Sequence, residues 1–549
     1  MPFTSLMNLM SQAPFHSKQS MSQSISTVRF WHQGEIKTIS SPSTHETVLE
    51  YLRSEAGGSA CGTKEGCAEG DCGACTVVIA ELRDHLHLEG QPLKASSTPE
   101  ASKLQYRAVN SCIRFAYQLD GCALWTVEDL ASAQSVAGEH PVQQALLAHH
   151  GSQCGFCTPG FVMSLFGLYQ QTMGSPEAIT RDQALESLSG NLCRCTGYRP
   201  ILDAALAMKT FPLVRQDEAR IVEKLQAFAA RPSQKTQGTV GTADESIFRP
   251  RALDDLLVLR AQYPDAQIIA GATDVGLWVT KQHQRFERVI DVTQVQELRQ
   301  VRHAESLLIG AAVRLEQAYE AICQARPQVA GFARRFAGRP VRESGTLGGN
   351  IANGSPIGDS MPLLISLGTR IRLVSQARGA RDIALEDFYL GYRKTQLAKD
   401  EILSEVLIPA PRPYEVSRIY KLSKRFEDDI SAVCLGIYLE LDATGTQIVA
   451  ARLGVGGVAA VPIRAKKTEE SLIGQAFNQT SFAAAKPVLA DEFNPISDMR
   501  ASAEYRKLAL SNLLLRFWQE VGTGSASPSQ GSTNLTQLDQ IALRALAWE

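Results

Sequence analysis

The sequence has 549 residues, more than one hydrophobic core usually supports, so we expect roughly two to four domains. Its 44% hydrophobic and 20% charged residues are typical of an ordinary soluble globular protein. The net charge of -2, from 55 Lys and Arg against 57 Asp and Glu, gives no electrostatic reason to expect nucleic acid or an anionic membrane as a partner. No uninterrupted apolar run reaches about 18 residues, so we expect no transmembrane helix.

The first residues, 1–24, are rich in Met and Ser, and we expect them to be disordered. They lack a basic segment followed by an apolar core, which is the pattern of a secretory signal, so we expect a cytoplasmic protein. The first strand-like run begins at about residue 25, which makes Met21 an alternative start of the chain.

Ten of the twelve cysteines lie before residue 200. In a chain without a secretory signal this concentration favours metal binding over disulfides, because the cytosol keeps thiols reduced. Cys67, Cys72 and Cys75 have the C-x4-C-x2-C spacing of plant-type ferredoxins, in which a loop wraps a [2Fe-2S] cluster. Three glycines among them allow tight turns that bring backbone N–H groups close to the sulfurs: Gly66, Gly70 and Gly73.

The fourth thiolate of this cluster must come from Cys61, Cys112 or Cys122. We favour Cys112, which directly follows a predicted strand. Cys61 precedes the loop and is equally compatible with a small buried residue, and Cys122 lies ten residues beyond Cys112.

A second group of cysteines consists of Cys154 and Cys157, spaced C-x2-C, and of Cys193 and Cys195, spaced C-x-C. The C-x-C pair does not suit a structural zinc, whose neighbouring ligands are usually separated by about two to four residues. The flanking segments have helical periodicity, so we expect both pairs on loops between helices. A helix that begins near Pro159 would direct its positive N-terminus toward the thiolates.

At these two motifs, over about residues 25–210, the sequence resembles the iron–sulfur region of the xanthine dehydrogenase and aldehyde oxidase family. The resemblance implies an α+β multidomain chain with a ferredoxin-like β-grasp domain at 25–124 and a four-helix domain at 125–212, each holding one [2Fe-2S] cluster. Local patterns agree, because residues 26–40 predict a hairpin around Gln33 and Gly34 and residues 44–57 predict the next helix. The polar stretch at about 83–105 is longer than the resemblance leads us to expect.

A polar stretch at 213–245 has the composition of a linker to a new domain. Two glycine-rich turns then follow strand-like runs, at 267–276 and 344–362, and neither is a GxGxxG fingerprint. Each turn alone is equally compatible with a plain hairpin or strand-to-helix turn. Because two cluster motifs precede these turns in the chain, we expect the turns to expose backbone N–H groups for a pyrophosphate. The residues concerned are Gly271, Ala272, Thr273, Asp274, Gly348, Gly349 and Asn350.

Both turns resemble the FAD-binding domain of the same family, which is of the vanillyl-alcohol-oxidase type. The resemblance implies an FAD domain at 246–413, a small α/β flavoprotein C-terminal domain at 414–520 and a flexible tail at 521–549. It also implies a set of FAD-binding residues. The pyrophosphate would lie on Ile268, Ile269, Ala270, Gly271, Ala272, Thr273, Asp274, Val275 and Gly276. Phe336 would stack on a ring, Thr346 and Asp359 would contact ribityl and phosphate oxygens near Gly349 and Asn350, Leu403 would pack on the dinucleotide, and Lys421 would reach the ring system. Without that role, Asp359 would cap a turn and Lys421 would be a surface charge.

Two one-electron carriers beside one two-electron carrier would turn single electrons into a hydride for an acceptor. The resemblance implies that the electrons come from a molybdenum-pterin cofactor on a large partner subunit, in a heterotetramer of two small and two large chains. Fusion of the iron–sulfur and flavin parts favours hypoxanthine and xanthine as substrates, and aldehyde or aromatic substrates are the alternative. A zinc-stabilised interaction scaffold is the remote alternative.

For the acceptor we expect NAD rather than oxygen. Tyr392 in GYRKT and the acidic run Glu427, Asp428 and Asp429 resemble the dehydrogenase pattern near the flavin face. Otherwise Tyr392 would be a packing residue and the acidic run a solvated loop.

Overall fold

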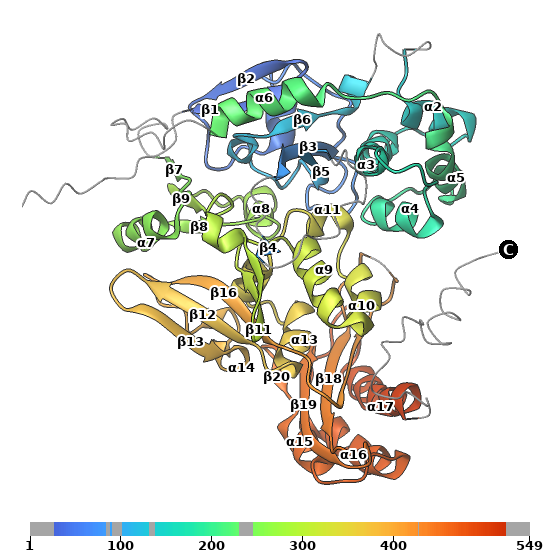
Figure 1. Ribbon diagram of the computed structural model, residues 1–549, viewed down its shortest axis with the longest axis vertical. Coiled ribbons are helices and arrows are strands. Elements are labelled where there is room, and N and C mark those ends of the chain that lie inside the picture. Colours follow the sequence, from blue (N-terminus) through green and yellow to red (C-terminus); the bar gives the residue numbers. More distant parts are fainter. Residues whose placement is uncertain are drawn as a thin grey trace, which may run out of the picture.

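The computed structural model describes residues 27–83, 88–89, 102–130, 138–229, 245–426 and 428–522. The expected disordered segment 1–24, the tail beyond 522, most of the polar stretch at 83–105, the second half of the expected linker and Glu427 therefore lie outside the described residues. In Figure 1 the N-terminal sheet and helices lie at the top, a central α+β part lies in the middle, and a four-stranded sheet with helices lies at the bottom.

The N-terminal part contains a five-stranded sheet with the order β2-β1-β6-β3-β5. The predicted hairpin is confirmed, because His32 of β1 pairs with Glu35 of β2 across Gln33 and Gly34, which both have positive φ. The predicted helix is also confirmed as α1, whose start is fixed by a capping box at Thr47. The elements are β1 Thr27–His32, β2 Glu35–Ser40, α1 Val48–Arg53, β3 Thr76–Leu82, β5 Leu104–Asn110 and β6 Ala123–Trp125.

Four helices follow, which are α2 Pro141–Ala148, α3 Thr158–Thr172, α4 Arg181–Leu188 and α5 Arg199–Ala207. Of these, α3 packs on this sheet, and α2, α4 and α5 pack against α3 or one another (Figure 1). Helix α3 contacts β3 and β5, and Val78 and Ala80 of the sheet share one buried cluster with Phe161 and Phe166 of the helix. The two expected domains at 25–124 and 125–212 therefore share a continuous hydrophobic core.

A helix occupies the first half of the segment that we expected to be a linker. This helix, α6, spans Glu218–Ala229 and lies along β1 (Figure 1). Its buried face joins the same core through Ile221, Val222, Leu225 and Phe228. The apolar residues have helical spacing, but the polar residues between them gave this segment the overall composition of a linker.

The central part contains two sheets. A three-stranded parallel sheet has the order β7-β9-β8, and a six-stranded sheet has the order β13-β12-β16-β11-β10-β4. The edge strand β4, Leu88–Glu89, comes from the N-terminal part and pairs in parallel with β10. The other strands are β7 Ser246–Phe248, β8 Gln267–Ile269, β9 Arg288–Asp291, β10 Val301–His303, β11 Ser306–Gly310, β12 Arg370–Ser375, β13 Gly379–Ala384 and β16 Ile402–Pro409, and a separate hairpin joins β14 Tyr389–Gly391 to β15 Lys394–Thr395.

The helices of the central part are mostly short. They are α7 Leu253–Gln262, α8 Val275–Thr280, α9 Leu315–Ala325, α10 Ala330–Arg334, α11 Arg339–Arg342, α12 Leu347–Asn353, α13 Ser360–Ser366 and α14 Leu385–Phe388. Buried residues of α9, α10, α12, α13 and α14 form one cluster with Ile309, Leu373 and Val406 of the six-stranded sheet. Those of α7 pack with β9, and Val279 of α8 packs with the first sheet. The second glycine-rich turn contains α12 and is held by the cluster of the six-stranded sheet. The first turn precedes α8, and its Ile269 and Ala272 pack in a cluster with Val77 and Val109 of the first sheet.

The C-terminal part is a four-stranded antiparallel sheet, β17-β18-β19-β20, with both faces covered. Along β18, Cys434 and Tyr438 face the central core, whereas Val433, Leu435 and Ile437 belong to the cluster with the C-terminal helices. None of the described helices is both long enough and apolar enough to cross a bilayer. The elements are β17 Glu415–Leu422, β18 Val433–Leu441, β19 Ile448–Gly456, β20 Ile463–Arg464, α15 Lys466–Leu472, α16 Gln479–Glu492 and α17 Ala503–Val521.

The central and C-terminal parts are joined by a buried ion pair, which yields a stability prediction. Arg326 donates to both carboxylate oxygens of Glu415, at 2.8 and 3.1 Å, and to the Pro409 carbonyl at 2.9 Å. Both side chains are at least 96% buried.

Arg326→Ala would leave a buried carboxylate unpaired, so we expect it to lower the free energy of unfolding by about 3 to 5 kcal/mol, measured by denaturant titration. Lys399→Ala, which removes a largely exposed ion pair with Asp265, is the control and should leave the transition in place. Equal transitions for the two variants would contradict the assignment.

Candidate functional site

Four cysteines from two segments meet at one end of the first sheet. Cys67, Cys72 and Cys75 lie between α1 and β3, and Cys112 directly follows β5. The thiol of Cys67 hydrogen-bonds those of Cys112 and Cys72, and Cys75 also hydrogen-bonds Cys112. These bonds, with backbone N–H groups of Glu69 and Cys72, hold the pKa of Cys67 well below its ordinary value. The arrangement therefore favours a thiolate, which is the form that binds metal.

The other two candidates for a fourth ligand lie elsewhere. The Sγ of Cys122 is buried 3.7 Å from Glu81 Oε1 and 3.6 Å from the Gln118 carbonyl oxygen. Burial raises the pKa of Cys122 to about 12. Cys61 is exposed, and its carbonyl accepts a hydrogen bond from Lys64. Of the three candidates, all of which the structure describes, it is Cys112 that contacts Cys67 and Cys75.

A glycine lets the loop backbone come close to the first four thiols. A Cβ at Gly66 would lie 2.8 Å from Cys72 Sγ, so a larger residue there would occupy the space beside the sulfur. Four thiols with backbone N–H groups directed at sulfur are the donor set of a [2Fe-2S] cluster. The residues present therefore fit this group.

The second group of cysteines forms two pairs at the surface of the helical part. Cys154 hydrogen-bonds Cys195, and both are exposed. Cys157 stands at the N-terminus of α3 and hydrogen-bonds Cys193, whose sulfur also accepts the Thr196 N–H at 3.4 Å. Among the described residues, no group of three or more His, Cys, Asp and Glu side chains could hold a single metal ion. Four thiols arranged as two pairs suit a cluster of two irons, so the second set also fits a [2Fe-2S] group.

A cavity of about 320 Å³ lies between the two glycine-rich turns. Burial raises the pKa of the Asp274 carboxyl in its wall, which hydrogen-bonds Asn353. The Asn350 Oδ1 is buried and, within the described part of the chain, has no hydrogen-bond partner, so a bound ligand could satisfy it. The predicted residues that line the cavity are Ile268, Ala270, Gly271, Ala272, Thr273, Asp274, Val275, Thr346, Gly348, Gly349, Asn350 and Leu403.

The sequence analysis missed several further lining residues, among them Trp278, Asn353 and Leu397. Trp278 and Asn353 each lie three residues after a predicted lining residue on the same short helix, α8 or α12. The i, i+3 neighbourhood on a helix was therefore a usable signal for both. Leu397 lies just after the β14–β15 hairpin, and its position depends on tertiary packing.

The two turns do not expose backbone N–H groups equally. In the second turn the expectation is wrong, because the N–H of Gly348 donates to Ala311 and those of Gly349 and Asn350 donate to Thr346. Thr346 is the N-cap of α12, and capping uses these donors. In the first turn, the N–H groups of Gly271, Ala272 and Thr273 donate to no oxygen among the described residues. The free donors for an anion are thus on the first turn.

Three other predicted residues lie in the packed core and not on the cavity. Ile269 is fully buried, and a Cβ at Gly276 would lie 2.6 Å from the Ile113 carbonyl oxygen. Phe336 packs edge-on or tilted against Tyr319 and Phe332, with ring centroids 5.1 and 6.2 Å away.

Asp359 and Lys421 form a buried ion pair, with Lys421 Nζ 2.9 Å from Asp359 Oδ2. Their side chains are only 7% and 4% exposed, so Lys421 is not a surface charge. The pair joins the start of α13 to β17 and lies outside the cavity wall. Tyr392, by contrast, is 60% exposed at the tip of the β14–β15 hairpin, with Arg393 over its ring at 5.6 Å.

The wall of the cavity also contacts the first cysteine loop. The Gln118 amide donates to the Ala270 carbonyl at 2.9 Å, and the Thr280 hydroxyl at the end of α8 donates to the Ala68 carbonyl at 2.9 Å. Lys281 donates to the Cys67 carbonyl. The segment 268–281 therefore lies between the cavity on one side and the first cysteine set on the other.

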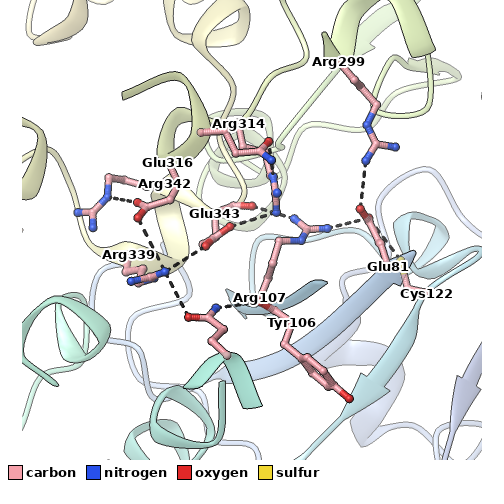
Figure 2. A network of polar contacts seen from close by, with 12 residues as sticks. Glu81, Tyr106, Arg107, Cys122, Arg299, Arg314, Glu316, Arg339, Arg342 and Glu343 are labelled. Atoms are coloured by element: carbon pink, nitrogen blue, oxygen red, sulfur yellow. Dashed lines mark hydrogen bonds and ion pairs between the residues drawn. The ribbon is translucent and has the colours of Figure 1, made fainter. Parts of the chain in front are cut away.

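A buried network of arginines and carboxylates also connects these parts (Figure 2). Glu81 of β3 binds Arg107 of β5 at 2.7 Å and Arg299 at 3.3 Å. Arg107 also donates to the Glu343 carbonyl, and Arg314 binds the Glu343 carboxylate at 3.1 Å. Burial alone would raise the pKa of Glu81, but the arginines hold it well below its ordinary value. Glu343 immediately precedes the second glycine-rich turn, so the network ties that turn to the first sheet.

Comparison with known proteins gives three consecutive family matches. Residues 126–206 match a [2Fe-2S] binding domain, 237–411 match the FAD binding domain in molybdopterin dehydrogenase, and 418–521 match the CO dehydrogenase flavoprotein C-terminal domain. Xanthine dehydrogenase 1 of Arabidopsis thaliana is 32% identical over 541 residues, which cover 86% of this chain and 38% of that protein. Xanthine dehydrogenase of Oryza sativa subsp. japonica is 32% identical over 502 residues, which cover 78% and 35%. This chain belongs to the molybdenum hydroxylase family.

Within the molybdenum hydroxylase family the chain corresponds to the iron–sulfur and FAD region, and it spans 38% of the length of the first relative. The carbon monoxide dehydrogenase chain of Hydrogenophaga pseudoflava is similar at 26% identity and a TM-score of 0.47, over 50% of this chain and 95% of that one. A chain of quinoline 2-oxidoreductase from Pseudomonas putida 86 is similar at 25% identity and a TM-score of 0.47, over 51% and 98%.

The α+β multidomain fold and the presence of FAD-binding and [2Fe-2S]-binding domains are therefore established for this member of the family. The matched ranges contain both glycine-rich turns and the second cysteine set. The first cysteine set precedes all three matched ranges, so its assignment rests on the geometry described above.

The close packing of the two turns gives a prediction about FAD content. A Cβ at Gly271 would lie 2.0 Å from the Ser344 carbonyl oxygen, and neither backbone segment can move without distorting the cavity. We expect Gly271→Ala to retain less than about a tenth of the FAD, since lost anion contacts are worth more than about 1.4 kcal/mol.

The measurement is the flavin released from the purified, acid-denatured protein. Gly331→Ala is the matched control, because a Cβ there meets nothing within 4 Å, and it should retain full FAD. Normal FAD content in Gly271→Ala would show that the first turn does not border the cofactor.

Proposed function

We propose that this chain is the electron-transfer subunit of a molybdenum hydroxylase that oxidises purines and reduces NAD. The observation that carries the proposal is the contact of three sites within one chain. The Leu192 N–H donates to the Cys72 carbonyl at 3.0 Å, which joins the two cysteine sets. The first cysteine loop in turn contacts segment 268–281, which lines the cavity.

The chain's own residues would hold the cofactors in a row. Cys67, Cys72, Cys75 and Cys112 would hold one [2Fe-2S] cluster, and the four cysteines of the second set would hold the other. The free N–H groups of the first turn would bind the FAD pyrophosphate. When bound, the clusters supply one-electron chemistry and FAD supplies the conversion to a two-electron hydride.

Asp359, Lys421 and Phe336 would support the flavin from positions outside the described cavity wall. Their burial favours a role in shaping the domain around the ring system. The ion pair also neutralises two charges that would otherwise be costly to bury next to an apolar ring.

A partner chain would supply the molybdenum-pterin cofactor and the purine site, as the family resemblance of the two cysteine motifs implies. The surface beside the second cysteine set suits such a partner. Cys154 and Cys195 are exposed there, with Phe156, Leu192 and Tyr198 exposed by 50%, 42% and 40%. Exposed apolar side chains around a redox site favour docking of a protein electron donor. We expect two copies of each chain, in a reducing cytoplasm that keeps the ligand thiols reduced.

The proposed acceptor site is the edge of the cavity near Tyr392. The hairpin that carries it is held against the cavity wall, because the Tyr389 hydroxyl donates to the Ile351 carbonyl of α12 at 3.0 Å. Leu397, just after the hairpin, lines the cavity. An exposed aromatic ring at this edge suits stacking with a nicotinamide. Asp428 and Asp429 lie on another loop, where Asp429 accepts the Arg425 N–H at 2.8 Å.

The cluster assignment predicts iron content. The native chain should contain two [2Fe-2S] clusters, hence four irons, and two distinct electron paramagnetic resonance signals after reduction. Cys112→Ser should lose half of the iron and one signal while it keeps FAD. Cys193→Ser should lose the other signal.

Cys122→Ser is the matched control, because Cys122 is also buried but contacts Glu81 and Gln118. It should keep all of the iron. Loss of a cluster in Cys122→Ser, together with full iron in Cys112→Ser, would move the fourth ligand to Cys122.

The acceptor assignment predicts a selective defect. In the complex with its molybdenum-containing partner, Tyr392→Ala should lower turnover with xanthine and NAD by about fivefold, since one aromatic stacking contact is worth about 1 kcal/mol. Turnover with an artificial dye that takes electrons elsewhere should be unchanged. Leu390→Ala, at an equally exposed position of the same hairpin, should affect neither assay. Equal loss with both acceptors, or turnover with oxygen and none with NAD, would exclude the proposed site.

A further inference from the structure

The two cysteine loops meet without any intervening side chain. Leu192 precedes Cys193 of the second set, and its N–H donates to the carbonyl of Cys72 of the first set at 3.0 Å. One hydrogen bond therefore connects the main chain of a ligand residue of the first set to that of the residue just before a ligand of the second set.

This approach is possible because glycines line the junction. A Cβ at Gly73, which has a φ of +69°, would lie 2.3 Å from the Gly190 carbonyl oxygen and 2.5 Å from Asn191 Nδ2. A Cβ at Gly160 on α3 would lie 2.1 Å from the Gly73 carbonyl oxygen. Three segments of backbone therefore pack directly against each other at this point.

The side chain of Asn191 hydrogen-bonds residues on both sides of this junction. Its Nδ2 donates to the Gly73 carbonyl at 3.1 Å and to the Thr76 hydroxyl at 3.4 Å. Its Oδ1 accepts the Ser164 hydroxyl of α3 at 2.6 Å. Asn191, Thr76 and Ser164 are 4%, 1% and 2% exposed, so water does not compete for these bonds.

The site uses both the NH2 group and the oxygen of the Asn191 carboxamide. A carboxylate could not donate to the Gly73 carbonyl, and an apolar residue would leave the Ser164 hydroxyl without its acceptor, while the Gly73 carbonyl would keep only the N–H and hydroxyl donors of Thr76 from its own loop. The side-chain contacts of Asn191 named above are to a backbone carbonyl and to two hydroxyl groups. They give this buried side chain no part in proton transfer or metal binding. What the contacts do is fix the first loop to the second.

We propose that Asn191 is a positioning residue that sets the separation and relative orientation of the two clusters, and so the rate at which electrons pass between them. The inference rests on the proposed function, because it requires both sets to hold clusters. Each transfer oxidises the cluster on one set by one electron and reduces the cluster on the other set by one electron, with no bond broken and no proton moved. Such a rate falls steeply as the gap widens, so a displaced loop is enough to slow it.

The test uses Asn191→Ala in the complete complex, with three measurements on the same sample. Iron analysis counts the clusters, the spin–spin splitting of the reduced clusters in electron paramagnetic resonance reports their separation, and rapid-freeze sampling reports how fast electrons redistribute between them. We expect four irons, weaker splitting and redistribution slowed by at least about tenfold, since misplacement by about 1 Å can cost that much or more.

Thr180→Ala is the matched control, because Thr180 caps α4 of the same helical part without touching the junction. It should destabilise the helix and leave splitting and redistribution unchanged. If Asn191→Ala loses iron, Ser164→Ala decides, because it removes one bond of Asn191 and leaves the Gly73 contact. Weaker splitting in Ser164→Ala would then support the proposal, and unchanged splitting would overturn it.

Unchanged splitting and redistribution in an iron-replete Asn191→Ala would likewise overturn the positioning role. A native chain with two irons, or without two distinct signals, would instead contradict the proposed function itself. The two failures are thus told apart on the unmodified protein before any variant is made.

Discussion

The buried arginines between the N-terminal and central parts determine how the sites face each other. Figure 2 draws together Glu81, Arg107, Arg299, Arg314 and Glu343, which come from five separate segments. Moving so many charges out of water is costly, and the mutual attraction offsets this only when the geometry is held closely. An alternative arrangement of the two parts would leave at least one arginine buried and unpaired. The network therefore favours a single placement of the first sheet against the second glycine-rich turn.

Direct backbone contacts also fix the position of the two parts relative to each other. Segment 268–281 contacts the first cysteine loop through Thr280 and Lys281 and contacts Gln118 through Ala270, and it supplies the free N–H groups of the cavity. The same short stretch therefore serves two neighbouring sites. Because it is held from both sides, its conformation is fixed before a ligand binds, which lowers the ordering cost of binding.

The sequence predicts those features that local spacing encodes. The C-x4-C-x2-C loop, the C-x2-C and C-x-C pairs and the hairpin at Gln33 and Gly34 each follow from residues close together in the chain. The α+β multidomain fold followed from a family resemblance carried by the same motifs. The contact of Cys112 with Cys67 depends on how β5 pairs with β3, so spacing left three candidates open.

The remaining differences have physical causes that local sequence does not show. The N–H groups of the second turn are taken up by Thr346 and Ala311, and this depends on where α12 begins and which strand it meets. Helix α6 was hidden because its polar face outweighs its buried residues in composition. Lys421 is buried because Asp359, far away in sequence, comes to pair with it. Tertiary contacts settle each of these, as they usually do at functional sites.

The edge strand β4 has a consequence for how this protein can be divided. Leu88 and Glu89 belong to the N-terminal part but complete the six-stranded sheet of the central part by pairing with β10. If the N-terminal and central parts were made as two polypeptides, β10 would become an open edge until the first polypeptide arrived. Open edges recruit strands from other chains, so the separated central part would be prone to aggregation. Linking the two parts in one polypeptide supplies the covering strand at high local concentration and suppresses that route to misassembly.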